Sequence, residues 1–354
     1  MLDIKIEKRE QLKEKPDMNN LGFGKYYTDH MFMLEWIKGE GFVNPRIIPY
    51  GPIEFDPACL VLHYAQETFE GMKAYKTNDG RILLFRPDMN AKRFQTSNER
   101  LCMPQLPVED FIQAVHDLVK FEADWIPTLP GTSLYIRPYM FAYQAKLGVH
   151  DAEHYKFMVI LSPVGSYYKE GLKPVKIYVE DKYVRAVKGG TGFTKCGGNY
   201  AASILSQIEA EKKGYSQVLW LDGVERKYVE EVGTMNAMFV IDGKIVTAPL
   251  DGSVLPGVTR DSMIHLLRSK GYTVEERKLS IDELVEAAKC GKLTEAFGTG
   301  TAAVISPIGV LAYKDEVFFN NPEIGPISQM LYDTLTGIQT GRLEDPFGWT
   351  YEVK

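Results

Sequence analysis

The residues most able to do chemistry lie in a glycine-rich stretch around one lysine, Lys195. Five of the ten residues from 189 to 198 are glycine, and Lys195 stands among them just before a predicted helix. Glycine lets a backbone come close to a flat ligand. A positioned lysine that is neutral can form a Schiff base with a carbonyl compound. An ordinary surface loop would also explain this composition, so the stretch alone leaves both interpretations open.

Three further segments supply what a Schiff-base cofactor with a pyridine ring and a phosphate would need. Glu231 lies in a predicted turn before a strand, where a carboxylate favours a protonated pyridine nitrogen. Residues 255–260 precede a predicted helix, whose free N–H groups suit a phosphate. Residues 298–302 form a loop of small residues and hydroxyls that also suits an anion. Each segment alone is more typical of a structural turn than of a ligand site, but together with Lys195 they favour one site.

The elements that must position these residues are mixed strands and helices. An Asp-Gly turn at 79–80 predicts a hairpin of strands 73–76 and 81–85. Apolar positions at helical spacing predict a helix over 107–124, and another helix is predicted over 200–213. Ser280 and Glu283 predict a capping box that opens a further helix. The mixture predicts an α+β fold rather than a regular βαβ array.

The length of 354 residues favours two domains. Residues 163–174 are rich in Gly and Pro and lack apolar periodicity, so they predict a linker. We therefore expect a small N-terminal α+β domain over 1–162 and a large C-terminal α+β domain over 175–354 that carries Lys195. Nine of the first fifteen residues are charged, which predicts a polar, loosely held arm.

The composition argues against several kinds of partner. The chain has 41 Lys and Arg against 47 Asp and Glu, a net charge of −6, so we expect neither nucleic acid nor a membrane surface as a partner. The charged start does not predict a secretory signal, and no apolar stretch is long enough to span a bilayer. The four cysteines lie far apart, which favours a reducing cytoplasm. The scattered histidines predict no metal site.

The motifs, taken in order, resemble those of the branched-chain amino acid aminotransferases, which are pyridoxal-phosphate enzymes of fold type IV. The resemblance covers nearly the whole chain and is closest to the larger, mammalian-like branch. It implies two mixed α/β domains of the D-amino acid aminotransferase-like architecture. The segments that carry it are Phe23-Gly24-Lys25, Phe69-Glu70-Gly71-Met72-Lys73-Ala74, Lys195-Cys196-Gly197-Gly198-Asn199-Tyr200, Glu231-Val232-Gly233-Thr234-Met235-Asn236, Leu255-Pro256-Gly257-Val258 and Gly300-Thr301-Ala302.

The resemblance implies reversible transfer of the amino group of L-leucine, L-isoleucine or L-valine to 2-oxoglutarate, giving a branched 2-oxo acid and L-glutamate. Pyridoxal 5'-phosphate would be held as a Schiff base on Lys195, whose amine then acts as general base and acid. D-amino acid aminotransferase and aminodeoxychorismate lyase stay open as alternatives within the fold. A non-catalytic binding protein is an alternative of another class, and the presence of all the expected cofactor ligands argues against it.

The resemblance also assigns the other residues of the cofactor site. Glu231 matches the acid on the pyridine nitrogen, Tyr200 the tyrosine on the 3-oxygen, and Arg93 the phosphate-binding arginine, whose fork of donors suits an anion. The remaining expected cofactor ligands are Thr234, Val258, Thr259 and Thr301.

The implied substrate pocket combines an apolar wall with groups for carboxylates. The wall would be formed by Phe23, Phe69, Tyr135 and Tyr167. Arg137 and Tyr64 would help to hold the second carboxylate of 2-oxoglutarate, and the backbone amides of Thr301 and Ala302 the α-carboxylate.

The resemblance further implies a homodimer in which the partner subunit completes each site. Tyr64, Leu147 and Val149 match the residues that come from the partner. The chain departs from mammalian members of the family at one place: where these carry a CxxC redox pair, it has Ala303 and Ser306. Thiol control of that kind is therefore not expected.

Overall fold

The computed structural model describes residues 1–166, 172–314 and 316–354. The chain forms two compact units. The N-terminal unit consists of Met1–Lys169, Thr194–Gly197 and Gly337–Lys354, and the C-terminal unit of Glu170–Phe193 and Gly198–Thr336. Lys195 thus groups with the N-terminal unit, although the chain on both sides of Thr194–Gly197 belongs to the C-terminal unit. The domain bounds 1–162 and 175–354 stay a prediction.

Long-range pairing explains why two late segments belong to the N-terminal unit. Strand β18 (Thr350–Val353) pairs antiparallel with β6 (Ile82–Phe85), which brings the end of the chain back to the first sheet. The carbonyl of Lys195 accepts a hydrogen bond of 2.9 Å from the Phe69 N–H. Neither pairing follows from a local pattern, because each joins residues more than 100 positions apart.

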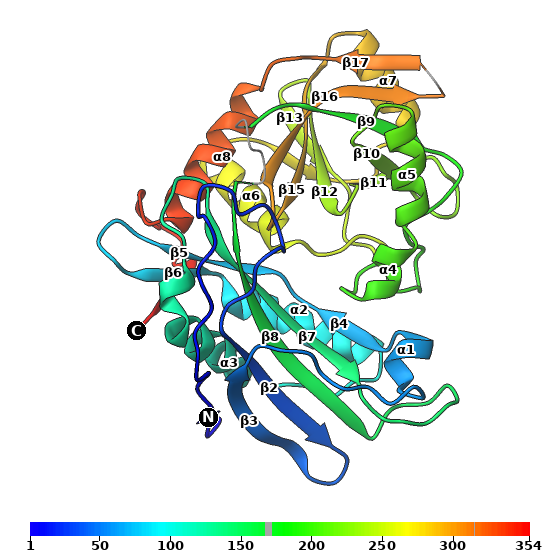
Figure 1. The fold of residues 1–354 in the computed structure, drawn as a ribbon. Helices are drawn as coiled ribbons and strands as arrows, with labels where there is room; N and C mark the ends of the chain where they lie inside the picture. Colours follow the sequence, from blue (N-terminus) through cyan, green and yellow to red (C-terminus); the bar gives the residue numbers. More distant parts are fainter. Residues whose placement is uncertain (167–171, 315) are drawn as a thin grey trace. The chain divides into compact units, whose positions relative to one another are not determined.

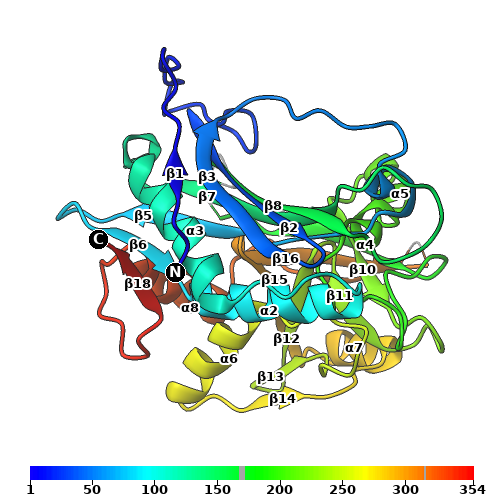
Figure 2. The same cartoon turned by 90° about the horizontal axis from the view of Figure 1, so that it is seen from below.

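The sheet of the N-terminal unit has the order β1-β3-β2-β8-β7-β5-β6-β18, with β4 also paired to β7. Figures 1 and 2 show its long strands. The hairpin of β5 and β6 confirms the Asp-Gly prediction. Strand β8 runs to Val164, two residues into the predicted linker 163–174, whose residues 167–171 lie outside the described part, so the linker stays a prediction. The remaining strands are β1 (Lys5–Ile6), β2 (His30–Ile37), β3 (Gly41–Pro49), β4 (Glu67–Phe69), β5 (Met72–Lys76), β7 (Ser133–Ala142) and β8 (His154–Val164).

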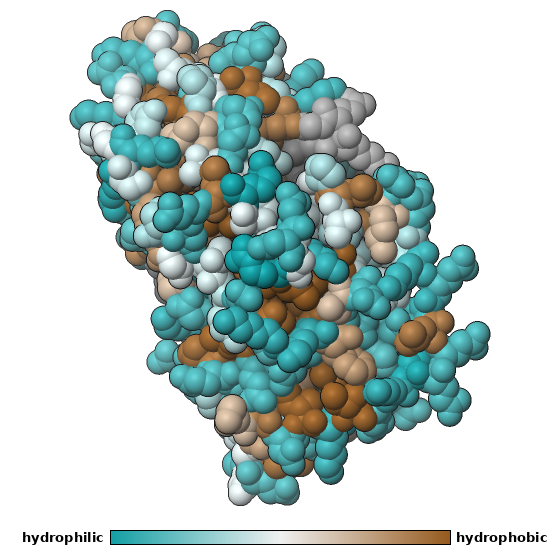
Figure 3. All heavy atoms as spheres, turned by 90° about the vertical axis from the view of Figure 1, so that its left-hand side faces the viewer, coloured by the Kyte–Doolittle hydropathy of each residue, from teal (hydrophilic) through white to brown (hydrophobic). Residues whose placement is uncertain are grey.

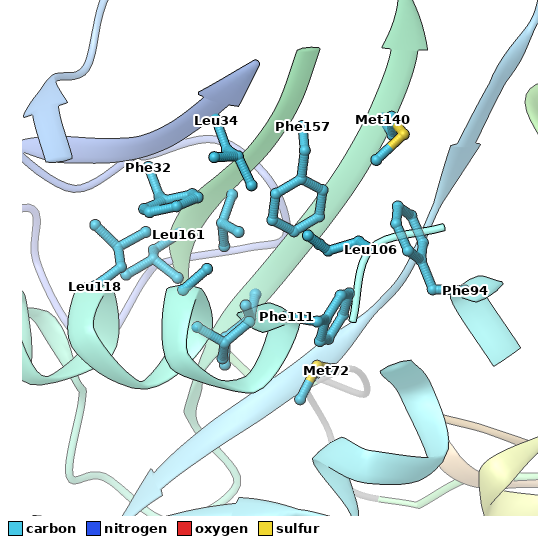
Figure 4. Packing of buried hydrophobic residues seen from close by; sticks show 14 of the residues in the cluster. Phe32, Leu34, Met72, Phe94, Leu106, Phe111, Leu118, Met140, Phe157 and Leu161 are labelled. Atoms are coloured by element: carbon cyan, nitrogen blue, oxygen red, sulfur yellow. The ribbon is translucent and has the colours of Figure 1, made fainter. Parts of the chain in front are cut away.

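Helices α2 (Pro87–Arg100) and α3 (Val108–Phe121) pack on this sheet, while α1 (Leu60–Tyr64) and the short 3-10 helix η1 (Ala123–Trp125) lie at its margins. The predicted apolar face of α3 is buried, since Phe111, Val115, Leu118 and Val119 are at most 1% exposed. Figure 4 shows the resulting core between helix and strands. Its centre is a triangle of aromatic rings, Phe94, Phe111 and Phe157, with centroids 5.4 to 5.8 Å apart.

The N-terminal arm is anchored, contrary to the prediction of a loosely held segment. Strand β1 pairs in parallel with β3. The N–H of Arg9 donates to His30 Nε2 at 2.8 Å, and the N–H of Lys13 to Asp29 Oδ1 at 2.7 Å. His30 and Asp29 are both buried, so the charged arm is held by polar groups that its own sequence does not indicate.

The sheet of the C-terminal unit has the order β11-β10-β9-β16-β15-β12-β13-β14, with β17 paired to β16. An additional pairing of β11 with β12 closes the strands from β11 to β12 into a ring, visible in Figure 1. The strands are β9 (Val175–Glu180), β10 (Gln217–Leu221), β11 (Val229–Val232), β12 (Met235–Ile241), β13 (Lys244–Thr247), β14 (Val274–Glu276), β15 (Leu293–Gly300), β16 (Val304–Tyr313) and β17 (Glu316–Asn320).

The helix predicted over 200–213 is interrupted, since α4 ends at Ala201 and α5 begins only after its N-cap residue, Ser203. Its N–H and Oγ both bond to the carbonyl of Tyr200, at 3.0 and 2.7 Å, which is a turn that competes with the helix. The predicted capping box is confirmed, since Glu283 N–H donates to Ser280 Oγ at 3.1 Å. The helices are α4 (Gly197–Ala201), α5 (Ile204–Lys212), α6 (Val258–Ser269), α7 (Ile281–Lys289) and α8 (Pro326–Gln339).

A quarter of the residues of this chain are charged, and a polar surface is therefore expected. Figure 3 shows one face of the molecule, on which hydrophilic side chains cover most of the area and hydrophobic ones form separate groups. Among the helices that the structure describes, none has the length and apolar character needed to cross a membrane.

Candidate active site

Lys195 is fixed in the N-terminal unit through its backbone. Its N–H donates to Ser97 Oγ on α2 at 3.0 Å, and its carbonyl accepts from Phe69 at the end of β4. Two residues on, the Gly197 N–H donates to the carboxylate of Glu67. A Cβ at Gly197 would lie 2.1 Å from Glu67 Oε1, so only glycine permits this approach. The loop is thus held along β4 through its backbone N–H and carbonyl groups.

The amine of Lys195 is buried, and the charges of Arg93 and Glu70 both act on it. Its Nζ is 4.9 Å from the centroid of the Phe69 ring. Burial and, to a smaller extent, the Arg93 charge lower the pKa of Lys195 to about 8, although the Glu70 charge opposes the shift. The neutral amine that a Schiff base requires is therefore accessible near physiological pH. Burial also lowers the pKa of Lys73 to about 8, so a lowered pKa alone does not single out Lys195.

Arg93 is held by a carboxylate that the sequence did not single out. Its Nε donates to Glu70 Oε1 at 2.8 Å and its Nη2 to Glu70 Oε2 at 2.7 Å, while Asn90 Nδ2 also donates to Oε2 at 2.7 Å. Burial acts to raise the pKa of Glu70, but the Arg93 charge and these hydrogen bonds outweigh it and the pKa is lowered. Glu70 thus fixes the orientation of the guanidinium on α2.

Replacing Glu70 by glutamine is expected to destabilise the protein by about 3–5 kcal/mol, because it leaves the buried guanidinium of Arg93 without its countercharge. Urea unfolding of the apoenzyme measures this. The matched control is Glu153→Gln, which removes the carboxylate of an exposed pair with Lys38 at 3.0 Å and should not change stability measurably. Equal urea midpoints for the two variants would contradict the assignment of Glu70.

The structure brings four of the predicted pocket residues together in the N-terminal unit. The Tyr135 ring meets the Phe23 ring edge to face at 4.9 Å. The Arg137 guanidinium lies 4.6 Å from the Phe69 ring centroid, and its Nη2 donates to the Tyr135 hydroxyl at 2.9 Å. A Cβ at Gly71 would lie 2.3 Å from that hydroxyl. An apolar wall and a fixed cation therefore share one cluster with Lys195.

The residues expected to serve a partner subunit have exposed side chains. Tyr64, Leu147 and Val149 are 40%, 62% and 87% exposed. The Tyr64 hydroxyl accepts from the Gly148 N–H at 2.9 Å, which ties the end of α1 to the segment that carries the other two. Tyr167 lies outside the described residues, and its expected role stays a prediction.

Glu231 is buried in the C-terminal unit, where the polar side chains of Arg185 and Asn236 contact it. The guanidinium of Arg185 pairs with its carboxylate, and Asn236 Nδ2 donates to Oε1 at 2.8 Å. Glu231 pairs with Asn236 and Asn236 with Thr299 across three neighbouring strands. A guanidinium favours the charged form of a carboxylate beside it, so Glu231 is prepared to act as an anion.

Three of the expected cofactor ligands share one small pocket of the C-terminal unit. Tyr200, Glu231 and Thr234 line a space of about 10 Å³, together with Arg185 and Leu255. The hydroxyl of Thr299 is buried and has no hydrogen-bond partner among the residues that the structure describes. A buried orphan hydroxyl calls for a polar ligand.

The expected phosphate ligands lie at a helix start and at a strand turn. Val258 and Thr259 are the first residues of α6, and no described side chain caps this end. A Cβ at Gly257 would lie 2.0 Å from Asn236 Oδ1, which explains the glycine. Thr301 and Ala302 form the turn between β15 and β16. The uncapped N–H groups, with the buried Glu231 and the orphan Thr299, fit a group that has both a phosphate and a basic ring nitrogen.

Sequence reasoning missed the residues that hold the expected ligands in place, namely Glu70, Arg185 and Asn236. Glu70 and Asn236 are inside motifs that were recognised for their neighbours. Their position is the signal that could have indicated them: Glu70 is an acid among apolar residues between β4 and β5, and Asn236 is an amide inside the otherwise apolar β12.

Comparison with known proteins agrees with this geometry. Residues 67–310 match the family described as Amino-transferase class IV. The chain is 56% identical to branched-chain-amino-acid aminotransferase 2 of Bacillus subtilis over 351 residues, 99% of this chain and 97% of the relative. It is 48% identical to the branched-chain-amino-acid aminotransferase of Mycolicibacterium smegmatis over 336 residues, 93% of this chain and 91% of the relative.

Solved structures give the same result. The crystal structure of the Escherichia coli branched-chain amino acid aminotransferase matches with a TM-score of 0.76 at 27% identity, covering 91% of this chain and 99% of that one. The enzyme from Thermobaculum terrenum, in its PLP form, matches with a TM-score of 0.74 at 26% identity, covering 91% and 98%. This chain belongs to the class IV aminotransferases, which depend on pyridoxal 5'-phosphate, and within them to the branched-chain-amino-acid aminotransferases.

Proposed function

We propose that this enzyme transfers the amino group of L-leucine, L-isoleucine or L-valine to 2-oxoglutarate and so forms a branched 2-oxo acid and L-glutamate. The observation that carries the proposal is the cluster of Lys195, Phe69 and Arg137: an amine whose pKa is lowered to about 8, an aromatic wall and a fixed cation. The wall suits a branched alkyl side chain, and the cation suits the second carboxylate of 2-oxoglutarate.

Each residue of the cofactor site has a distinct proposed task. When bound, pyridoxal 5'-phosphate withdraws electrons from the α-carbon of the amino acid. Lys195 Nζ would hold the cofactor and, once released, would move the proton between the α-carbon of the amino acid and C4′ of the cofactor. Glu231 keeps the ring nitrogen protonated, and Tyr200 bonds the 3-oxygen. Thr234 also contacts the cofactor, and the phosphate is bound by Arg93, Val258, Thr259 and Thr301.

Arg137 allows one pocket to accept both an apolar and an acidic side chain. Its guanidinium lies over the Phe69 ring and bonds the Tyr135 hydroxyl, so its charge is partly compensated by the ring face when no carboxylate is present. Tyr64 assists with the second carboxylate, and the amides of Thr301 and Ala302 hold the α-carboxylate. Phe23 and Tyr167 complete the apolar wall.

The proposal includes a homodimer in the cytoplasm. The exposed side chains of Tyr64, Leu147 and Val149 support it, because apolar side chains with this exposure gain from burial against a partner, and in the proposal they reach the partner's pocket. The four free cysteines are compatible with a reducing compartment.

Incubation of the purified protein with 2-oxoglutarate and either L-leucine or D-alanine tests the function. We expect glutamate from L-leucine, with kcat/KM for L-leucine, L-isoleucine and L-valine far above that for D-alanine. Since kcat/KM measures discrimination between substrates, turnover of D-alanine alone would instead support the D-amino acid aminotransferase alternative and refute the proposal.

A further inference from the structure

A second and larger cavity lies in the C-terminal unit. Its volume is about 230 Å³, and it shares no lining residue with the pocket beside Glu231. Its apolar lining includes Val224, Val229 and Val254, and its polar lining includes Glu230 and Ser253. The cavity thus combines an apolar wall with several charged side chains, among which four carboxylates outnumber two lysines.

Glu230 lines this cavity, and only one of its two carboxylate oxygens has a hydrogen-bond donor in the described part of the chain. It is 8% exposed. Ser253 Oγ donates to its Oε1, whereas its Oε2 is buried and has no hydrogen-bond partner in the described part of the chain. Burial raises the pKa of Glu230, Ser253 and Arg185 oppose the shift, and Asp222 and Asp251 add to it. A buried carboxylate oxygen without a donor is costly.

The other charged groups around the cavity already have partners. Lys188 pairs with Asp251 at 2.7 Å, and Lys278 lies 3.9 Å from Glu225. The Asp222 carboxylate accepts four backbone N–H groups from residues 224, 225, 227 and 228, which lower its pKa to about 2 although burial acts to raise it. Glu230 Oε2 is therefore the buried carboxylate oxygen of this lining that lacks a donor in the described part of the chain.

We propose that this cavity binds a small aliphatic ammonium compound, whose N–H donates to Glu230 Oε2 and whose alkyl part packs on Val224, Val229 and Val254. A cation with a donor N–H satisfies the carboxylate, and the three valines match an alkyl chain. This site is additional to the proposed substrate pocket, and its test does not depend on the aminotransferase function.

Two hydrogen bonds and one ion pair link the cavity to Glu231. Ser253, which bonds Glu230 through its hydroxyl, accepts from Arg185 Nη2 at its carbonyl at 2.6 Å. Arg185 in turn pairs with Glu231. Glu230 and Glu231 are neighbours on β11, where successive side chains point to opposite faces. An occupant of the cavity should therefore change the surroundings of the cofactor ring.

Titration calorimetry of the holoenzyme with N,N-dimethylisobutylammonium tests the site. This tertiary amine keeps one N–H and cannot form a Schiff base, so it cannot react at Lys195. We expect saturable binding at one site per chain, weakened about tenfold or more by Glu230→Gln, since a hydrogen bond to a charged group is lost. The matched control, Glu225→Gln on the same cavity wall, should weaken binding threefold or less. The quaternary analogue N,N,N-trimethylisobutylammonium, which lacks the N–H, should bind at least tenfold more weakly.

A second variant keeps the test decisive if Glu230→Gln fails to fold. Val224 is 80% exposed, so Val224→Trp can fill the cavity from its rim without burying new polar groups, and it should abolish binding. Absence of saturable binding to the wild type, or equal affinities of Glu230→Gln and Glu225→Gln, would overturn the site. Binding that leaves the visible circular dichroism of the bound cofactor unchanged would overturn the link to Glu231.

Discussion

Replacing Lys195 by alanine is expected to reduce transamination between L-leucine and 2-oxoglutarate by at least about 10³-fold, because positioned proton transfer alone contributes about 10²–10⁴-fold and the bond to the cofactor is lost as well. The fold should persist. The loop is held by the N–H and carbonyl of residue 195, which bond Ser97 and Phe69, and alanine keeps both. Glutamate formation and thermal unfolding measure the two outcomes.

Lys73 provides the control for this prediction. It is a second lysine of the same unit whose pKa burial lowers to about 8, so it offers a neutral amine as readily as Lys195. Borohydride reduction of the holoenzyme followed by peptide mass analysis should nevertheless place the cofactor's mass on Lys195 alone. Label on Lys73, or full activity of Lys195→Ala, would contradict the assignment.

The pH dependence of cofactor loading follows from the same lysine. Below a pH of about 8 the Lys195 amine is mostly protonated and cannot attack a carbonyl, and above it the amine is mostly neutral. The rate at which the apoenzyme takes up pyridoxal 5'-phosphate should therefore rise with pH and level off above about 8. An ordinary lysine would give a rate that still rises towards its usual pKa of 10.5.

Much of the fold could be predicted from local sequence. The β5–β6 hairpin, α3 and the capping box of α7 follow from turn residues, periodicity and caps that act within a few positions. The return of β18 to β6 and the anchoring of the N-terminal arm could not, because they depend on partners more than 15 residues away. The break at Ser203 was missed because its hydroxyl bonds the backbone in competition with the helix.

The residues of the candidate site also fall into two groups, those that the sequence indicated and those that it did not. Motifs indicated the groups that would touch a cofactor or substrate, such as Lys195 and Glu231. The groups that hold them, such as Glu70 and Arg185, were not indicated, since a buried ion pair is recognised only when both partners are seen. The roles of the motif residues remain predictions, and the variants of Lys195 and Glu231 test them.

Replacing Glu231 by glutamine is expected to lower kcat/KM for L-leucine by about 10–100-fold, since a hydrogen bond between charged groups contributes about 1.5–3 kcal/mol. A neutral amide cannot keep a ring nitrogen protonated as a carboxylate does. The matched control is Glu180→Gln. Glu180 is another buried glutamate in the sheet of the C-terminal unit, and its carboxylate accepts the N–H groups of Lys182 and Tyr183 at 2.8 and 3.0 Å. It should retain the wild-type kcat/KM.

Arg185 makes the prediction for Glu231 sharper, because its guanidinium is the positive charge that pairs with that carboxylate. In Arg185→Met the Glu231 anion loses the adjacent guanidinium but keeps the hydrogen bond from Asn236. Protonation of Glu231 should then occur at higher pH, so that activity falls off earlier on the acid side, while KM for L-leucine changes little. Arg185→Lys restores a positive charge and should recover part of the acid limb. If Glu231→Gln and Glu180→Gln had equal kcat/KM, or if Arg185→Met kept the wild-type pH profile, Glu231 would not be the group that holds the ring proton.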